Sequence, residues 1–119
     1  MVNKFKSQAK SKKQTTLMEQ AQLKEKADKV LAKVPEEYVF WCHDGRTFRD
    51  MKDLAEGLAI ISDDIFAYHV DSEKNDFSKW VKDIINDEQL ASDLASLTNR
   101  MQAAECVTAR LTILTSKIP

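Results

Sequence analysis

The sequence predicts a small α+β domain that is predominantly α-helical, a small helical bundle with one short β-hairpin. Three observations predict this class. The chain has 119 residues, which is enough for one domain with one core. It contains only two glycines and two prolines, so few tight turns interrupt its helices. One short segment, residues 38–42, concentrates aromatic and β-branched side chains, as strands do.

The sequence predicts a disordered basic tail over residues 1–14 and a single helical domain over residues 15–119. The tail has no acidic residue and no apolar periodicity. Its basic arm consists of Lys4, Lys6, Lys10, Lys12 and Lys13. Thr15 or Thr16 is expected to cap the first helix, and Pro35 is expected to end it. The apolar stripe of this helix is thin, so the helix needs a partner surface.

The β-hairpin is expected at about residues 38–48. Its first strand leads into Asp44 and Gly45, a dipeptide typical of a two-residue hairpin turn. Thr47 and Phe48 then supply the returning strand. Because a lone hairpin is marginal in water, its aromatic face is expected to pack on helices.

The remaining helices are delimited by residues that favour N-caps. These residues are Asp50, Ser62, Asn75 or Asp76, and Asp87. Asn86 suits a left-handed exit from the helix before it. The last helix is expected to run unbroken over about residues 88–115, because its apolar residues recur every three or four positions. The first and last helices are the long ones, and we expect them to pair antiparallel, either within the chain or between two chains.

Charge is distributed unevenly along the chain, although the net charge is only −1. Residues 1–33 carry nine basic against three acidic groups, whereas residues 34–119 carry nine basic against sixteen acidic groups. A basic arm on an acidic body favours contact with nucleic acid, with an acidic partner or with a neighbouring copy of the protein.

The cysteines and the apolar runs bear on where the protein resides. Cys42 and Cys106 form neither a CxxC pair nor a zinc spacing, so reduced thiols in a cytoplasmic protein are expected. No apolar run approaches the roughly 18 residues that span a membrane. The basic N-terminus has no apolar stretch behind it, so a secretory signal is not expected.

The most informative segment is residues 69–80, which places polar and aromatic side chains between two predicted helices. His69, close to Asp71, Asn75 and Asp76, can be interpreted as a general base or a metal ligand. In the favoured structural interpretation, Asn75 or Asp76 caps a helix and His69 hydrogen-bonds across the junction. The chain carries no catalytic, cofactor or metal motif, so no catalytic residue, cofactor or metal is predicted.

A second group of reactive side chains surrounds the predicted hairpin turn. Cys42, His43 and Asp44 are consecutive, but neighbouring strand residues point to opposite faces, which argues against a cysteine–histidine pair there. A thiol–imidazole pair of Cys42 with His69 is geometrically open, although no family signature supports it.

Arginines and aromatic residues near the hairpin have two interpretations each. Arg46 and Arg49 can stack on bases or bind phosphate, but pairing with nearby acids is favoured. The acids in question are Asp44, Asp50 and Asp53. The aromatic residues can line a ligand pocket, but their strand and helix spacing favours the core. They are Phe40, Trp41, Phe66, Phe77 and Trp80.

Residues 68–80 read Tyr-His-Val and then, after three residues, Lys-Asn-Asp-Phe-x-x-Trp. With Asp-Gly-Arg at residues 44–46 and Leu-Ala at residues 90–91, this pattern resembles an uncharacterised family of small prokaryotic, mainly archaeal, domains. The family has no assigned activity, so the resemblance implies a fold and little more. It also implies one functional or structural unit made of His69, Asn75, Asp76, Phe77 and Trp80.

We therefore predict a non-enzymatic protein-interaction or adaptor module that docks on a protein partner through a helix face or the hairpin rim, or that forms a homodimer. The candidate interaction residues are His69, Asn75, Asp76, Trp80, Arg46 and Arg49. The alternative is a nucleic-acid or ribonucleoprotein-associated factor that uses the basic arm. A small enzyme built on His69 and its carboxylates is a third hypothesis, which requires a solvent-reachable pocket at that residue.

Overall fold

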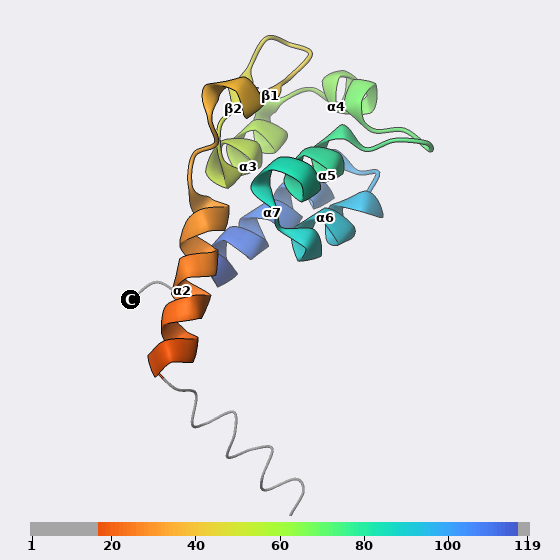
Figure 1. Ribbon diagram of the computed structural model, residues 1–119. Helices are drawn as coiled ribbons and strands as arrows, with labels where there is room; N and C mark the ends of the chain where they lie inside the picture. The colour runs from red at the N-terminus through yellow and green to blue at the C-terminus, as the bar shows by residue number, and fades with distance from the viewer. Residues whose placement is uncertain (1–16, 117–119) are drawn as a thin grey trace, which may run out of the picture.

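The computed structural model describes residues 17–116, with side chains from residue 19 onward (Figure 1). Its elements are α2 (Leu17–Leu31), the 3-10 turn η1 (Glu36–Tyr38), β1 (Phe40–Trp41), β2 (Thr47–Phe48), α3 (Met51–Ile60), α4 (Asp63–His69), α5 (Asp76–Trp80), the π-helical turn η2 (Val81–Ile85), α6 (Glu88–Ala95) and α7 (Arg100–Thr115). Helices dominate, and the strands form a two-stranded antiparallel sheet. The predicted α+β class is confirmed.

The N-terminal predictions fall partly outside this range. The tail at residues 1–14, with its five lysines, lies outside the described residues, as do the predicted caps Thr15 and Thr16. α2 ends at Leu31, upstream of Pro35 as expected, although the restriction imposed by the proline acts on Val34 and the helix stops before that residue.

The predicted hairpin is present, but its turn is longer than predicted. The register pairs Phe40 with Phe48 and Trp41 with Thr47. The Cys42 N–H donates to the Arg46 carbonyl at 2.8 Å, and the Gly45 N–H donates to the Cys42 carbonyl at 2.9 Å. Gly45 has a φ of 95° but Asp44 has no positive φ, so the two-residue turn is excluded. The loop is instead the three-residue type, in which only the last residue adopts the left-handed region.

Four predicted N-caps are confirmed, because each side chain accepts a hydrogen bond from a backbone N–H in the first turn. They are Asp50 for α3, Ser62 for α4, Asn75 for α5 and Asp87 for α6. The left-handed exit at Asn86 is also confirmed, with a φ of 68°. Each cap satisfies a donor that the helix leaves unpaired, so these boundaries are set by local sequence.

The prediction of one unbroken helix over residues 88–115 is wrong. The segment forms two helices, α6 and α7, and Asn99 caps the second. Arg100 binds the start of α7 to the end of α3, because its guanidinium donates to the carbonyls of Leu58 and Ala59 at 2.8 and 3.0 Å. These carbonyls belong to the last turn of α3, whose final C=O groups lack helical partners. The apolar stripe runs on across the break, so periodicity alone concealed it.

The core lies where α3 and α7 pack against each other, and this is the most extensive contact between elements in the described chain. α2 makes smaller contacts with both. The main partner of α7 within the chain is therefore α3, and not the first helix as predicted. The largest fully buried side chains are those of Met51, Leu54, Leu58, Phe77, Val81, Leu90, Leu94 and Val107. No helix within residues 17–116 is both long and apolar enough to cross a bilayer.

The hairpin is seated on α3 by a close contact of Phe48 with Gly57. A Cβ atom on Gly57 would overlap the ring of Phe48, which is itself buried. A glycine inside a helix costs up to about 1 kcal/mol relative to alanine. The close approach of the ring explains why glycine stands there, and it places β2 directly against α3.

Candidate functional site

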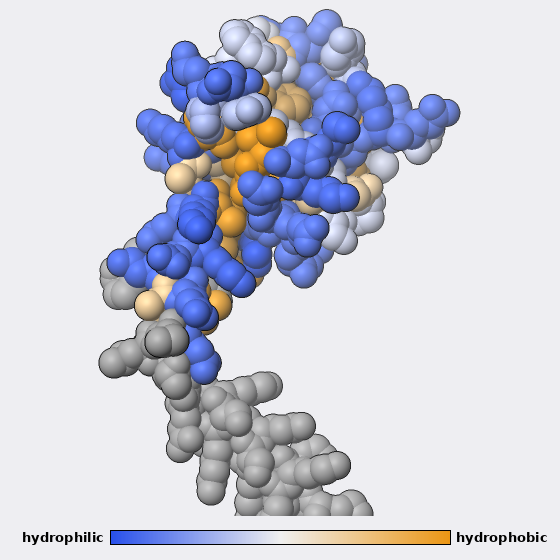
Figure 2. All heavy atoms as spheres, in the orientation of Figure 1, coloured by the Kyte–Doolittle hydropathy of each residue, from blue (hydrophilic) through white to orange (hydrophobic). Residues whose placement is uncertain are grey.

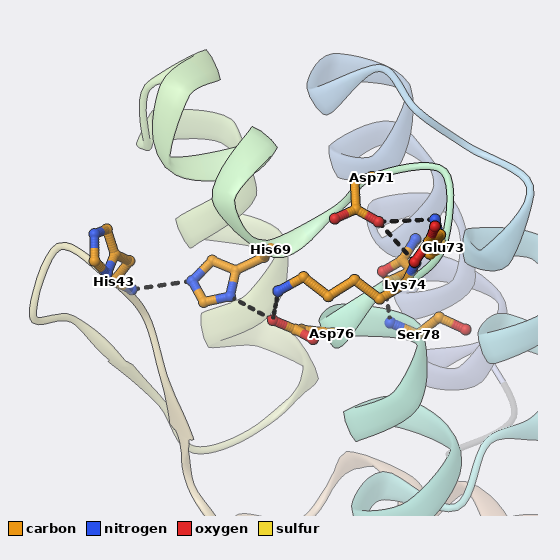
Figure 3. Close-up of polar contacts among 8 residues, drawn as sticks. His43, His69, Asp71, Glu73, Lys74, Asp76 and Ser78 are labelled. Carbon is orange, nitrogen blue, oxygen red and sulfur yellow. Dashed lines mark hydrogen bonds and ion pairs between the residues drawn. The ribbon is translucent and has the colours of Figure 1, made fainter.

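His69 joins the end of α4 to the hairpin loop and to the start of α5 (Figure 3). Its side chain is buried, with Nε2 3.0 Å from the His43 backbone nitrogen and Nδ1 2.9 Å from Oδ2 of Asp76. Because a backbone N–H can only donate, Nε2 accepts this bond and the ring proton lies on Nδ1, which donates to Asp76. The two contacts hold the imidazole as one neutral tautomer.

This arrangement leaves His69 without an unoccupied ring nitrogen. To accept a substrate proton or to bind a metal, the ring would have to break its bond to the His43 N–H. Within the described residues, no three His, Cys, Asp or Glu side chains are placed to hold a metal ion. The geometry therefore agrees with the structural interpretation of His69, a hydrogen-bonded junction between two elements.

The acidic and amide neighbours of His69 reach different elements. Asp71 turns away from the imidazole, and its Oδ1 accepts the N–H groups of Glu73 and Lys74 at 2.8 and 2.9 Å (Figure 3). Asp76 is shared, because Nζ of Lys74 also lies 3.2 Å from the oxygen that faces His69. The predicted cluster of one histidine with two aspartates is thus reduced to the single pair of His69 and Asp76.

Asn75 and Trp80 connect α5 to neighbouring elements by hydrogen bonds. Asn75 caps the helix through Oδ1, and its Nδ2 donates to the Leu94 carbonyl of α6 at 3.0 Å. Trp80 is buried, and its Nε1 donates to the Tyr38 carbonyl before the hairpin at 2.8 Å. The residues of segment 69–80 therefore tie the hairpin, α4, α5 and α6 together instead of converging on one cavity.

Aromatic rings fill the space beneath the His69 junction. The ring of Phe77 lies 4.9 Å from that of Phe40 and 5.2 Å from the imidazole of His69, measured between centroids. Trp80 meets Phe40 edge-on at 5.8 Å, a preferred geometry for aromatic pairs. The core interpretation of these aromatic residues agrees with the structure, and Trp41 is the exception.

Cys42 is buried beside this junction and is not paired with His69. Burial raises the pKa of the Cys42 thiol, and the neighbouring carboxylate of Asp44 adds to the rise while backbone hydrogen bonds oppose it. A raised pKa keeps the thiol protonated, whereas a nucleophilic cysteine requires the thiolate. Both ring nitrogens of His69 are bound elsewhere, so no thiol–imidazole pair forms.

The two arginines near the hairpin differ in their contacts. Nε of Arg46 lies 2.7 Å from Oδ2 of Asp44, which agrees with the pairing interpretation. Hydrogen bonds from the side chain and then the backbone N–H of Arg46 lower the pKa of the Asp44 carboxyl. The side chain of Arg49 is exposed and forms no ion pair with the described residues, although Asp53 accepts its backbone N–H at 3.0 Å.

The hairpin end of the molecule also exposes aromatic side chains. Trp41 is 70% exposed, although the sequence placed it in the core. Tyr68 is half-exposed and stacks on the ring of His43 with the centroids 3.7 Å apart. We define the hairpin rim as the exposed side chains of Tyr38, Trp41, His43, Arg49 and Tyr68. Of these five residues, only Arg49 is an interaction candidate predicted from the sequence.

Comparison with known proteins adds no assignment. No family model, curated protein or solved structure matches this chain. The resemblance to a mainly archaeal family therefore stays a prediction.

The sequence does contain a signal for the exposure of Trp41. Phe40 and Cys42 are buried on either side of it, and alternate residues of a strand point to opposite faces. With the inner face assigned to Phe40 and Cys42, Trp41 has to face solvent. The same alternation that places Cys42 and His43 on opposite faces therefore predicts an exposed Trp41.

Proposed function

We propose that this protein is a non-enzymatic protein-interaction module that docks on a partner protein through the hairpin rim. The observation that supports this proposal is the 70% exposure of Trp41 on a strand whose other residue is buried. Tryptophan is enriched at protein interfaces relative to the rest of the protein surface, and it is among the residue types most frequent in interface hot spots.

The composition of the hairpin rim resembles that of an interface hot spot. Tryptophan, tyrosine and arginine are the residue types that contribute most binding free energy at interfaces, and the rim exposes all three. Burying the exposed part of Trp41 would contribute about 3–4 kcal/mol before the entropic costs of association. The hairpin is fixed by hydrogen bonds of His69 and Trp80 to the backbone of His43 and Tyr38. A surface that is already ordered loses less entropy when it binds, which favours affinity.

The charges on the rim indicate the chemistry of the partner. Arg46 is neutralised by Asp44, whereas Arg49 has no acidic partner among the described residues. The partner we propose presents an apolar side chain to Trp41 and an acidic group to Arg49. Cys42 and Cys106 are free thiols, and the proposal includes a cytoplasmic location because that compartment keeps thiols reduced.

The test is affinity capture from the native lysate with the tagged full chain, with and without nuclease. Wild-type protein is compared with Trp41→Ala and Arg49→Glu, and Met101→Ala serves as the control because Met101 is a half-exposed apolar residue on α7. A partner that resists nuclease is then purified and titrated by calorimetry. We expect Trp41→Ala to weaken binding by more than about tenfold while Met101→Ala binds as wild type. Unchanged affinity of Trp41→Ala would reject the hairpin rim as the docking surface.

The alternative function is nucleic-acid binding through the basic arm, and five lysines without an acid in residues 1–14 favour it. Binding of this kind weakens steeply with salt, because each neutralised phosphate releases counterions. Deleting residues 1–13 is expected to abolish binding to RNA or DNA and to leave capture through the hairpin rim intact. Nucleic-acid binding that survives this deletion with the same salt dependence would reject the arm.

A further inference from the structure

A groove of about 540 Å³ opens between α2, the corner from η2 to α6, and the C-terminal part of α7. Its apolar lining consists of Leu23, Ala27, Val30, Ile84, Ile85 and Leu114. In Figure 2, a seam of hydrophobic residues runs from below the hairpin down along the inner edge of α2, whose outer side is hydrophilic. We call the groove with this lining the α2 groove, and none of its lining residues belongs to the hairpin rim.

α2 is the least covered helix of the domain on this side. Among its described side chains only Ala27 is buried, and Leu23 is 45% exposed although it faces the groove. Val30, one helical turn further along the same face, is half-buried. A helix with so thin an apolar stripe gains most of its stability from packing, so an uncovered groove leaves part of that stabilisation unused.

The two walls of the α2 groove carry opposite charges. Lys26 and Lys29 line it from α2, and Glu88 lines it from the first turn of α6. None of these three side chains forms an ion pair with the described residues. The buried pair of Asp87 with Arg110 lies between the walls and is already satisfied, with Nε 2.7 Å from Oδ2. The unpaired charges therefore belong to the lining of the groove, on opposite walls.

We infer that the α2 groove is closed by a second copy of this chain, which lays its own α2 antiparallel along it. A twofold interface brings the same surface together from both subunits, so that surface has to be complementary to itself. An α2 wall with lysines and an α6 wall with a glutamate meet this condition, because Lys26 and Lys29 of each copy face Glu88 of the other. Leu23 of each copy then covers the exposed apolar side of the opposite groove.

Sedimentation velocity of the full chain at increasing concentration tests the inference. We expect a concentration-dependent equilibrium of monomer and dimer for the wild type. Leu23→Asp should raise the dimer dissociation constant by about 100-fold or more, because it buries an unpaired charge at the interface. Ile113→Asp is the control, since Ile113 is a comparably exposed apolar residue of α7 outside the groove lining. A monomer at every concentration, or a dimer indifferent to Leu23→Asp, overturns the inference.

Charge reversal provides a second test that does not alter apolar packing. Glu88→Lys alone, or Lys26→Glu with Lys29→Glu, should each weaken the dimer about tenfold, and the combined triple variant should restore it. Glu105→Lys, an exposed change of the same charge outside the groove lining, controls for net charge. Circular dichroism confirms that each variant is folded. Failure of the triple variant to recover dimerisation overturns the proposed pairing. Trp41→Ala should leave the dimer unchanged, so docking through the hairpin rim and dimerisation through the α2 groove can each be rejected without the other.

Discussion

The imidazole of His69 accepts a hydrogen bond from the backbone N–H of His43, a residue 26 positions earlier in the chain. Through this contact the hairpin loop is bound to the end of α4, while the other ring nitrogen reaches Asp76 at the start of α5. One neutral side chain thus joins three elements, and its two nitrogens are used in opposite senses, as acceptor and as donor.

Replacing His69 by alanine should lower the free energy of unfolding by about 2–4 kcal/mol. The variant loses two hydrogen bonds and the packing of a buried ring, and it leaves the His43 N–H without its acceptor. Urea denaturation measures the change. His43→Ala is the matched control, because it keeps the backbone N–H that His69 accepts and removes an exposed side chain with its stack on Tyr68. A loss below about 1 kcal/mol in His69→Ala would contradict the structural role.

Breaking the pair of Asp87 and Arg110 should be costly. Asp87 is 4% exposed, caps α6 and binds Arg110 through both oxygens, so Arg110→Met leaves a buried carboxylate without its cation. We expect a loss of about 3 kcal/mol in urea denaturation. Arg46→Met breaks an ion pair of similar length at the surface and should cost less than about 1 kcal/mol. Equal losses in the two variants would show that burial does not govern the Asp87 pair.

Gly57→Ala should destabilise the protein by about 1–2 kcal/mol, although alanine is the better helix former. The new Cβ overlaps the ring of Phe48, and this overpacking outweighs the gain in helix propensity. The combination with Phe48→Leu relieves the overlap, so a thermal denaturation cycle should show that the two losses are less than additive. Strict additivity would show that Phe48 is not what the alanine meets.

Gly45→Ala should cost about 1 kcal/mol for a different reason. Nothing lies within 4 Å of the added Cβ, but the φ of 95° is unfavourable for any residue with a side chain. Gly45→Asn is the informative control, since asparagine tolerates the left-handed region better than alanine does. Chemical denaturation should therefore rank glycine above asparagine and asparagine above alanine, and a more stable alanine variant would contradict the loop geometry.

Cys42 should react slowly with iodoacetamide in the folded protein. Burial raises its pKa above the ordinary value of 9.0, so the reactive thiolate appears only at higher pH than in the unfolded chain. The same shift has a consequence for stability. Because the folded state binds the thiol proton more tightly, the stabilisation is complete below the ordinary pKa and is lost as the pH rises through the folded value.

Mass spectrometry of the modified peptide at a series of pH values measures the Cys42 reactivity, with the urea-unfolded protein as reference. In Cys42→Ala the loss of stability above the ordinary pKa should be smaller. It should not vanish, because burial also raises the pKa of Cys106. A native Cys42 that reacts as fast as the unfolded one at neutral pH would contradict the burial.

Part of the candidate site could be predicted from the sequence. Asn75 was expected to cap a helix and does so, because a cap depends on residues within one turn. The choice of Asp76 over Asp71 as the partner of His69 could not be predicted, since it depends on how the turn at residues 71–74 bends. The hydrogen bond from Trp80 to the carbonyl of Tyr38, which lies far away in the sequence, could not be predicted either, because sequence spacing carries no information on contacts between distant segments.

The sequence by itself determined the elements whose signals are local. N-caps such as Ser62, the left-handed Asn86 and the apolar faces of the helices all act within a few residues, so the helical class and most boundaries follow from them. The break before α7 has a local signal in the cap Asn99, but tertiary structure decided the direction of α7 after it, since Arg100 gains its partners only when α3 lies beside it. Tertiary structure also left the α2 groove open. Such features depend on which surfaces meet, and the free energy of that choice comes from packing between distant segments.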